Sequence, residues 1–213
     1  MRSRAERLAR ALRAPSALLI LERALVVVGV LLLGYYGYVS VEARLYQAYE
    51  NRELDAILQS GPSANSHGAA ATRATRAAPE PGTVIGRIEI PRLRVSTIVR
   101  AGSDARTLRL AVGHIEGTAF PGGSGNVGLA GHRDTFFRRL EEIQPDDEIR
   151  LVTPDGTFVY QVERTDVVRP DDIWVLDPTD TPTLTLVTCY PFTYVGSAPE
   201  RFIVRASGTF PGS

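Results

Sequence analysis

The chain has 213 residues, 44% of them hydrophobic, and its 24 basic and 24 acidic side chains leave no net charge at neutral pH. This composition can build a folded core, and it gives no electrostatic case for binding nucleic acid. The chain contains a single cysteine, Cys189, which excludes an internal disulfide.

The first predicted element is an uncharged apolar run at residues 24–41, long enough to cross a bilayer core of about 30 Å as a helix. The segment 1–23 before it is rich in arginine, whereas acidic residues surround the two arginines that follow it. The positive-inside rule therefore predicts a single-pass anchor with segment 1–23 in the cytoplasm and the rest of the chain outside. A cleaved signal peptide is the alternative, but no small-x-small cleavage site lies between Tyr35 and Arg44.

Residues 42–82 predict a stem followed by a flexible linker. The stem is expected to be helical over about Glu42 to Leu58, and the linker from Gln59 to Gly82 is small, polar and proline-bearing, with almost nothing to bury. His67 lies in this linker and is therefore not considered a catalytic candidate.

From Thr83 to Ser213 short apolar runs alternate with glycine, proline and aspartate, which predicts one all-β domain, a sandwich or a barrel. A hairpin is expected where Pro154, Asp155 and Gly156 separate two alternating segments. One short helix is expected over residues 134–143, with Asp134 or Thr135 as its N-cap. The seven predicted strands are 83–90, 92–99, 126–131, 148–153, 157–164, 183–188 and 201–206.

Two weak motifs offer other functions. The glycines of "GSGNVG" at residues 123–128 fit a dinucleotide-binding pattern, but a strand follows them instead of the required helix, so they are interpreted as loop residues. A metal site built from His114, His132 and Cys189 is conceivable, because open zinc sites use such ligands, although no short ligand spacing supports it.

Cys189 directly follows the strand-like run 183–188 and has two interpretations. A lone cysteine is commonly a small buried hydrophobe. In an extracytoplasmic domain, however, a free thiol is exposed to oxidants, and a histidine and an arginine lie on other strand-like segments of the same domain. The residues alone leave both interpretations open.

Three segments together carry a family resemblance: "TLVTC" at 185–189, "LAGHRD" at 129–134 and "APERFIV" at 198–204. They resemble the sortases, the membrane-anchored cysteine transpeptidases of bacterial surfaces, over roughly residues 83–206. The segment "TCYPF" and the N-terminal anchor are similar to class D in particular.

The resemblance implies an eight-stranded β-barrel with one or two short helices after the transmembrane helix. It implies that His132, Cys189 and Arg201 are catalytic and that Thr188 supports the oxyanion. No metal or organic cofactor is required. His114 is the rival histidine for proton transfer.

A protein of this family would cleave an LPxTG-like sorting signal and transfer the acyl group to an amine of peptidoglycan, a pilin or another surface component. It would lie in the bacterial cell membrane with exported proteins as partners. On the residues alone, Arg201 could instead be a surface arginine paired with Glu200, and Arg205 would share its face of the strand. Two other functions stay open: a cysteine endopeptidase with water as the acceptor, and a non-catalytic anchored adaptor domain.

Overall fold

The computed structural model describes residues 15–59, 79–194 and 196–208. The chain divides into two compact units, one up to Arg44 and one from Leu45 onward, and each is described by itself. Most of the predicted cytoplasmic segment and most of the predicted linker, including His67, lie outside the described residues.

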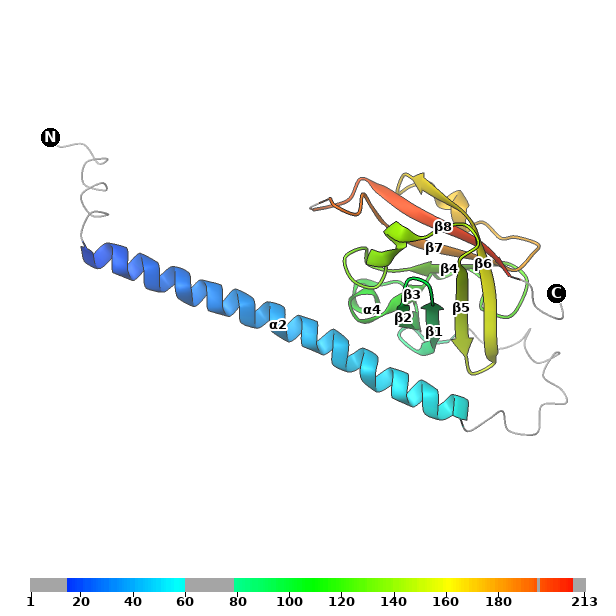
Figure 1. The fold of residues 1–213 in the computed structure, drawn as a ribbon, viewed down its shortest axis with the longest axis horizontal. Coiled ribbons are helices and arrows are strands. Elements are labelled where there is room, and N and C mark those ends of the chain that lie inside the picture. Colours follow the sequence, from blue (N-terminus) through cyan, green and yellow to red (C-terminus); the bar gives the residue numbers. More distant parts are fainter. Residues whose placement is uncertain (1–14, 60–78, 195, 209–213) are drawn as a thin grey trace. The chain divides into compact units, whose positions relative to one another are not determined.

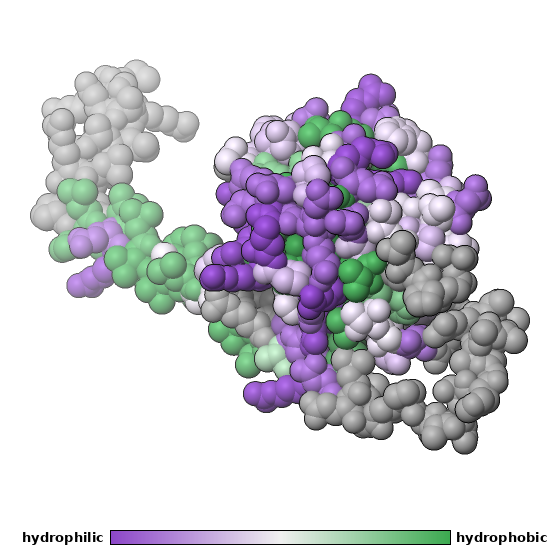
Figure 2. Space-filling view, turned by 45° about the vertical axis from the view of Figure 1, so that its right-hand side comes forward, coloured by the Kyte–Doolittle hydropathy of each residue, from purple (hydrophilic) through white to green (hydrophobic). Residues whose placement is uncertain are grey.

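The first unit contains most of helix α2, Pro15–Gln59. Within the described residues, one helical stretch is long and apolar enough to cross a membrane, namely Leu18–Tyr38, with a mean hydropathy of 2.2. Its side chains are exposed, and they form the green surface of this helix in Figure 2. The stretch begins before the expected run at residue 24 and includes Glu22 and Arg23.

The second unit is a closed barrel of eight strands in the order β1-β2-β3-β4-β7-β8-β6-β5 (Figure 1). The all-β prediction and the eight-stranded barrel implied by the resemblance are therefore confirmed. The strands are β1 Val84–Ile90, β2 Val95–Ala101, β3 Val112–His114, β4 Asn126–Ala130, β5 Glu148–Thr153, β6 Gly156–Val168, β7 Thr183–Tyr190 and β8 Glu200–Gly208. The short helices are α4 Ala105–Leu110 and the 3₁₀ turns η2 Arg138–Glu142 and η3 Ile173–Leu176.

Alternation of side chains explains the inside of the barrel. Strand β7 turns Leu184 and Leu186 into one apolar cluster, where they meet residues from the other strands, such as Ile88 and Val204. The predicted hairpin is confirmed as β5 and β6, which pair from Thr153 and Gly156 outward. The Thr153 hydroxyl closes its turn by donating to the Gly156 carbonyl at 3.0 Å.

The sequence patterns did not predict three short elements, namely β3, α4 and the 3₁₀ turn η3. Strand β3 has only three residues, all of them buried, so it shows no alternation of exposed and buried positions. Helix α4 begins after Asp104, whose carboxylate accepts hydrogen bonds from the N–H groups of Arg106 and Thr107.

The predicted helix over 134–143 is wrong at its start, because the described helical turn is η2 and begins at Arg138 with no side-chain cap. The Asp134 carboxylate accepts from Arg133 Nε at 3.2 Å, so it pairs with its neighbour instead of capping a helix. Phe137, just before η2, is fully buried in the barrel core.

The last turns of α2, from Leu45, belong to the barrel unit. Leu54 is buried against Ile98 and Ala111. The Gln47 side chain accepts from the Ile98 N–H at 2.9 Å and donates to the Leu110 carbonyl at 2.7 Å. The barrel thus includes a helical stem that the sequence patterns did not assign to it.

Candidate active site

Strand β7 carries Cys189 and lies between β4 and β8, its parallel and antiparallel neighbours (Figure 1). In the antiparallel pair, Cys189 lies directly opposite Arg201. Side chains of directly opposed residues on one face lie within about 4.5–5.5 Å at Cβ. Strand pairing therefore brings together two of the three predicted catalytic residues, which the loop between β7 and β8 separates in the sequence.

His132 comes from the other side of β7. The last described pair of the parallel ladder joins Ala130 to Val187, and the Gly131 N–H then donates to the Val187 carbonyl at 3.1 Å. The Thr188 hydroxyl donates to the Gly131 carbonyl at 2.8 Å. These two bonds hold Gly131, the residue before His132, against the end of β7 that carries Cys189.

Cys189 and Arg201 share one face of the sheet, and His132 lies just after the end of β4. Leu129, Leu186 and Val204 point into the core, so the residues that alternate with them on β4, β7 and β8 face outward. His132 is exposed, and Cys189 and Arg201 are half-buried, so all three positions are accessible from solvent.

Arg201 does not use its guanidinium in an ion pair with Glu200. Its Nη1 donates to the backbone carbonyls of Glu200 at 2.9 Å and Ala198 at 3.3 Å. Among the ion pairs between described residues, none includes Arg201. The cation is therefore free of a carboxylate within this part of the chain.

Arg205 shares the face of Arg201, but the strand register separates them. Arg205 lies opposite Thr185, four residues before the cysteine, and its Nη1 donates to the Val175 carbonyl at 3.1 Å. Burial lowers the pKa of Arg205, which is consistent with a side chain that packs under η3. Of the two arginines, only Arg201 lies opposite Cys189 in the strand register.

His114 lies in β3, which does not neighbour β7. It is 2% exposed, its Nε2 lies 2.8 Å from the Ala119 carbonyl, and its ring stacks on Phe120 with centroids 4.3 Å apart. Burial lowers the pKa of His114, so it is held as a neutral core residue. This placement gives it a structural role and removes it as the rival of His132.

The position of His114 also argues against a metal site built from His114, His132 and Cys189, because strand β4 lies between the strands that carry His114 and Cys189. Within the part of the chain that the structure describes, no group of three His, Cys, Asp or Glu residues is close enough to hold a metal ion.

Two arginines next to this site were not singled out by the sequence analysis. Arg133 Nη1 donates to the Pro191 carbonyl at 2.6 Å, and its Nη2 donates to the Tyr194 carbonyl at 2.7 Å. Arg138 donates to the Phe192 carbonyl. Both therefore hold the loop that follows Cys189. The signal that could have found them is their position, one directly after the histidine of "GHRD" and the other in the next turn.

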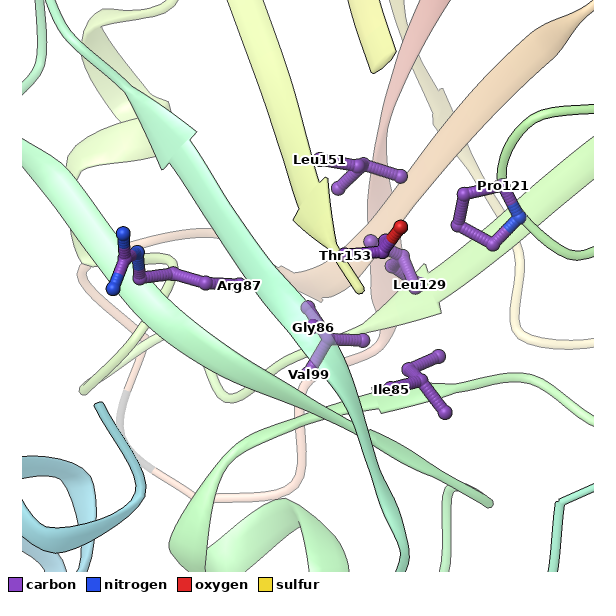
Figure 3. A pocket seen from close by; sticks show the side chains of 8 residues that line it. All are labelled: Ile85, Gly86, Arg87, Val99, Pro121, Leu129, Leu151 and Thr153. Atoms are coloured by element: carbon purple, nitrogen blue, oxygen red, sulfur yellow. The ribbon is translucent and has the colours of Figure 1, made fainter. Parts of the chain in front are cut away.

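A recess elsewhere in the barrel is not part of this site. It is lined by apolar side chains such as Ile85, Val99 and Leu151, together with Arg87 and Thr153 (Figure 3). These residues come mainly from β1, β2 and β5, and β1 lies four strands from β7 around the barrel. None of the three predicted catalytic residues lines it.

Comparison with known proteins identifies the barrel. The chain is 39% identical over 127 residues to Sortase D of Bacillus subtilis, covering 59% of this chain and 64% of that protein. It is 35% identical over 131 residues to Sortase SrtE1 of Streptomyces coelicolor, covering 53% of this chain and 37% of the relative. The matched segment thus spans less than two thirds of the length of either curated relative.

Solved structures agree. A Sortase D5 transpeptidase of Clostridium perfringens has the same fold, with a TM-score of 0.62 and 28% identity over 80% of this chain and 99% of that one. The Sortase domain family matches residues 88–209, which are more than half of the 213 residues. The chain therefore belongs to the sortase family, and class D is represented among both its relatives and its structural neighbours.

Proposed function

We propose that this chain is a membrane-anchored cysteine transpeptidase, with Cys189 as the nucleophile, His132 as the acid and base, and Arg201 as the electrostatic support. The observation that carries the proposal is the strand register, which puts Arg201 opposite Cys189 and the His132 segment on the other flank of the same strand. Family membership supports the same assignment.

The first half-reaction breaks a peptide bond. The Cys189 thiolate attacks the threonine carbonyl of an LPxTG-like sorting signal, and a tetrahedral intermediate forms. The C–N bond to glycine then breaks, the leaving amine takes a proton from the His132 imidazolium, and a thioester remains on the sulfur. An ordinary cysteine with a pKa of about 8.5 is only a few per cent ionised near neutrality, so a neighbouring cation is needed to favour the thiolate.

The second half-reaction forms a new amide bond. An acceptor amine gives a proton to the neutral His132 imidazole and attacks the thioester carbonyl, and Cys189 leaves as the thiolate. The acceptor is an amine of peptidoglycan, a pilin or another surface component. The exported protein that carried the sorting signal becomes covalently attached.

Arg201 stays protonated at working pH and cannot act as a base. Its task is to hold the substrate carbonyl and to offset the negative charge of the tetrahedral oxyanion. Loss of one comparable oxyanion donor costs about 3 kcal/mol, or two to three powers of ten in rate. Thr188 supports the site because its hydroxyl donates to the Gly131 carbonyl. This bond links the residue before Cys189 to the residue before His132.

The helix over Leu18–Tyr38 would anchor the enzyme in the bacterial cell membrane. The arginine-rich segment before it favours a cytoplasmic N-terminus and an extracytoplasmic barrel. In this orientation the enzyme meets its substrates after their export.

Intact-mass spectrometry tests the proposal. The full chain in detergent micelles is mixed with a pool of LPxTG-type peptides, with and without triglycine as the amine, and quenched in acid. An acyl adduct on the wild-type chain, absent in Cys189→Ala, and a triglycine-linked product are expected. No adduct on a folded wild-type chain would contradict the proposal, and hydrolysis that is unaffected by the amine would favour the endopeptidase.

The two arginines of β8 supply a matched comparison. Arg201→Ala is expected to slow acylation about 100-fold to 1,000-fold, by loss of oxyanion support. Arg205→Ala removes the same side chain from a position opposite Thr185 instead of Cys189, and is expected to slow acylation less than tenfold. Equal losses in the two variants would contradict the role given to Arg201.

A further inference from the structure

Arg133 is a buried arginine directly after His132. Its side chain is 6% exposed, whereas arginine is almost never fully buried unless its charge has partners. Its carboxylate partner, Asp134, is 70% exposed, and an ion pair with so exposed a partner contributes little. The hydrogen bonds to the Pro191 and Tyr194 carbonyls are the shorter contacts, at 2.6 and 2.7 Å.

These two carbonyls belong to the loop between β7 and β8, whose ends carry Cys189 and Arg201. Pro191 lies two residues after the cysteine, and Tyr194 lies five residues after it. Arg133 itself continues the chain that leaves β4 through Gly131 and His132. One guanidinium therefore joins the segment that bears the histidine to the segment that follows the thiol.

The geometry requires an arginine. A planar guanidinium has five N–H donors in a fixed fork, so it can bind two carbonyls and a carboxylate at once, whereas an ammonium is a compact point charge. Charge-assisted hydrogen bonds in a buried position are also stronger than those between neutral groups. Arg138 binds the same loop at Phe192, but its side chain is 46% exposed, so solvent competes for its contacts.

We propose that Arg133 is a positioning residue that fixes the distance between His132 and Cys189 by clamping the β7–β8 loop to the exit of β4. The effect of this clamp on catalysis rests on the function proposed above. Its effect on the distance between His132 and Cys189 does not, because the clamp orders the two segments whether or not a peptide is bound.

An engineered disulfide measures this order directly, because the chain has no cysteine other than Cys189. His132→Cys places a second thiol beside Cys189, and a disulfide requires Cα atoms within about 4.4–6.8 Å of each other. The full chain in detergent micelles is equilibrated with reduced and oxidised glutathione, which takes up the two electrons and two protons of the thiol pair. The ratio of disulfide to dithiol is read by intact mass. It gives the effective concentration of one thiol for reaction with the other.

The test adds Arg133→Gln to the His132→Cys chain, and Arg87→Gln serves as the matched control. Arg87 is also largely buried and paired, with Asp55 and Glu89, but it lies on β1, four strands from β7. We expect Arg133→Gln to lower the effective concentration at least threefold and Arg87→Gln to leave it within that limit. A smaller fall for Arg133→Gln, an equal fall for Arg87→Gln, or no disulfide with His132→Cys alone would overturn the proposal.

Near-ultraviolet circular dichroism verifies that each variant is folded. If Arg133→Gln does not fold, Arg133→Lys takes its place and is judged by the same limit, because it keeps the charge but not the two-carbonyl fork.

Kinetics on the chain with His132 intact form the second part of the test. Arg133→Gln is expected to lower kcat at least tenfold with KM within twofold, since the Arg133 side chain is buried and positions the reacting groups. A merely structural role would change the fraction of folded enzyme, read from near-ultraviolet circular dichroism, but not kcat per folded chain. Absence of any acyl transfer by the wild-type chain would refute the proposed function, and the disulfide measurement would still decide the clamp.

Discussion

The Gln47 side chain offers a quantitative test of the docked stem. Its amide binds two backbone groups of the barrel: the N–H of Ile98, at 2.9 Å, and the carbonyl of Leu110 at the C-terminal end of α4, at 2.7 Å. The Thr97 hydroxyl adds a third contact at 3.1 Å. Gln47→Ala leaves both partly buried backbone groups without this partner, at about 1 kcal/mol each.

The expected loss is therefore about 2 kcal/mol in the free energy of unfolding, which lowers Tm by roughly 4–8 °C for a domain of this size. Urea unfolding of the full chain in detergent micelles measures it, with near-ultraviolet circular dichroism reporting on the buried Tyr160.

Gln161→Ala removes an exposed glutamine from β6 and is the matched control. If Gln47→Ala destabilises the chain no more than Gln161→Ala does, the stem contributes no stability through these bonds and the reasoning is refuted.

Two further substitutions test the inside of the barrel. Burial lowers the pKa of His114, so the unfolded chain takes up a proton more readily than the folded one; the free energy of unfolding should be highest above about pH 6.5 and fall as the pH drops below it. His114→Gln should flatten that slope in urea unfolding across this range, and an unchanged slope would contradict the assignment. A Cβ on Gly131 would lie 2.7 Å from the buried Phe137 ring, so Gly131→Ala should lower stability by about 1–3 kcal/mol and slow acylation by moving His132. Gly123→Ala, where nothing lies within 4 Å of the added Cβ, should change neither property, and equal effects of the two substitutions would exclude the steric explanation.

Local patterns were sufficient for most of the barrel. Alternation located seven strands, and turn chemistry located the β5–β6 hairpin, because both signals arise from neighbouring residues. Strand β3 was missed because three buried residues carry no periodicity. The stem was missed as part of the barrel because Gln47 and Leu54 find their partners more than forty residues away.

The proximity of the candidate catalytic residues depends on strand order, which no local pattern encodes. Strands β4 and β7 are neighbours although two other strands lie between them in the sequence. The family motifs predicted Cys189 and Arg201 as catalytic residues. The strand register, which places Cys189 opposite Arg201 and Thr185 opposite Arg205, is seen only in the fold. The expected helix start at Asp134 is wrong because residues 132–137 form a turn, in which the Phe137 N–H donates to the His132 carbonyl at 3.1 Å.

Closure of the sheet also limits how a peptide can be recognised. Strand β7 is paired on both sides over Thr183–Val187, with β4 on one side and β8 on the other, so no further strand can join the ladder along that stretch. β-Augmentation, which reads backbone far more than side chains, is therefore blocked over Thr183–Val187, whereas Thr188–Tyr190 have β8 alone as a described strand partner. An extended segment that associates with the outside of β7 over this stretch would therefore be selected through its side chains and through the loops at the border of the sheet.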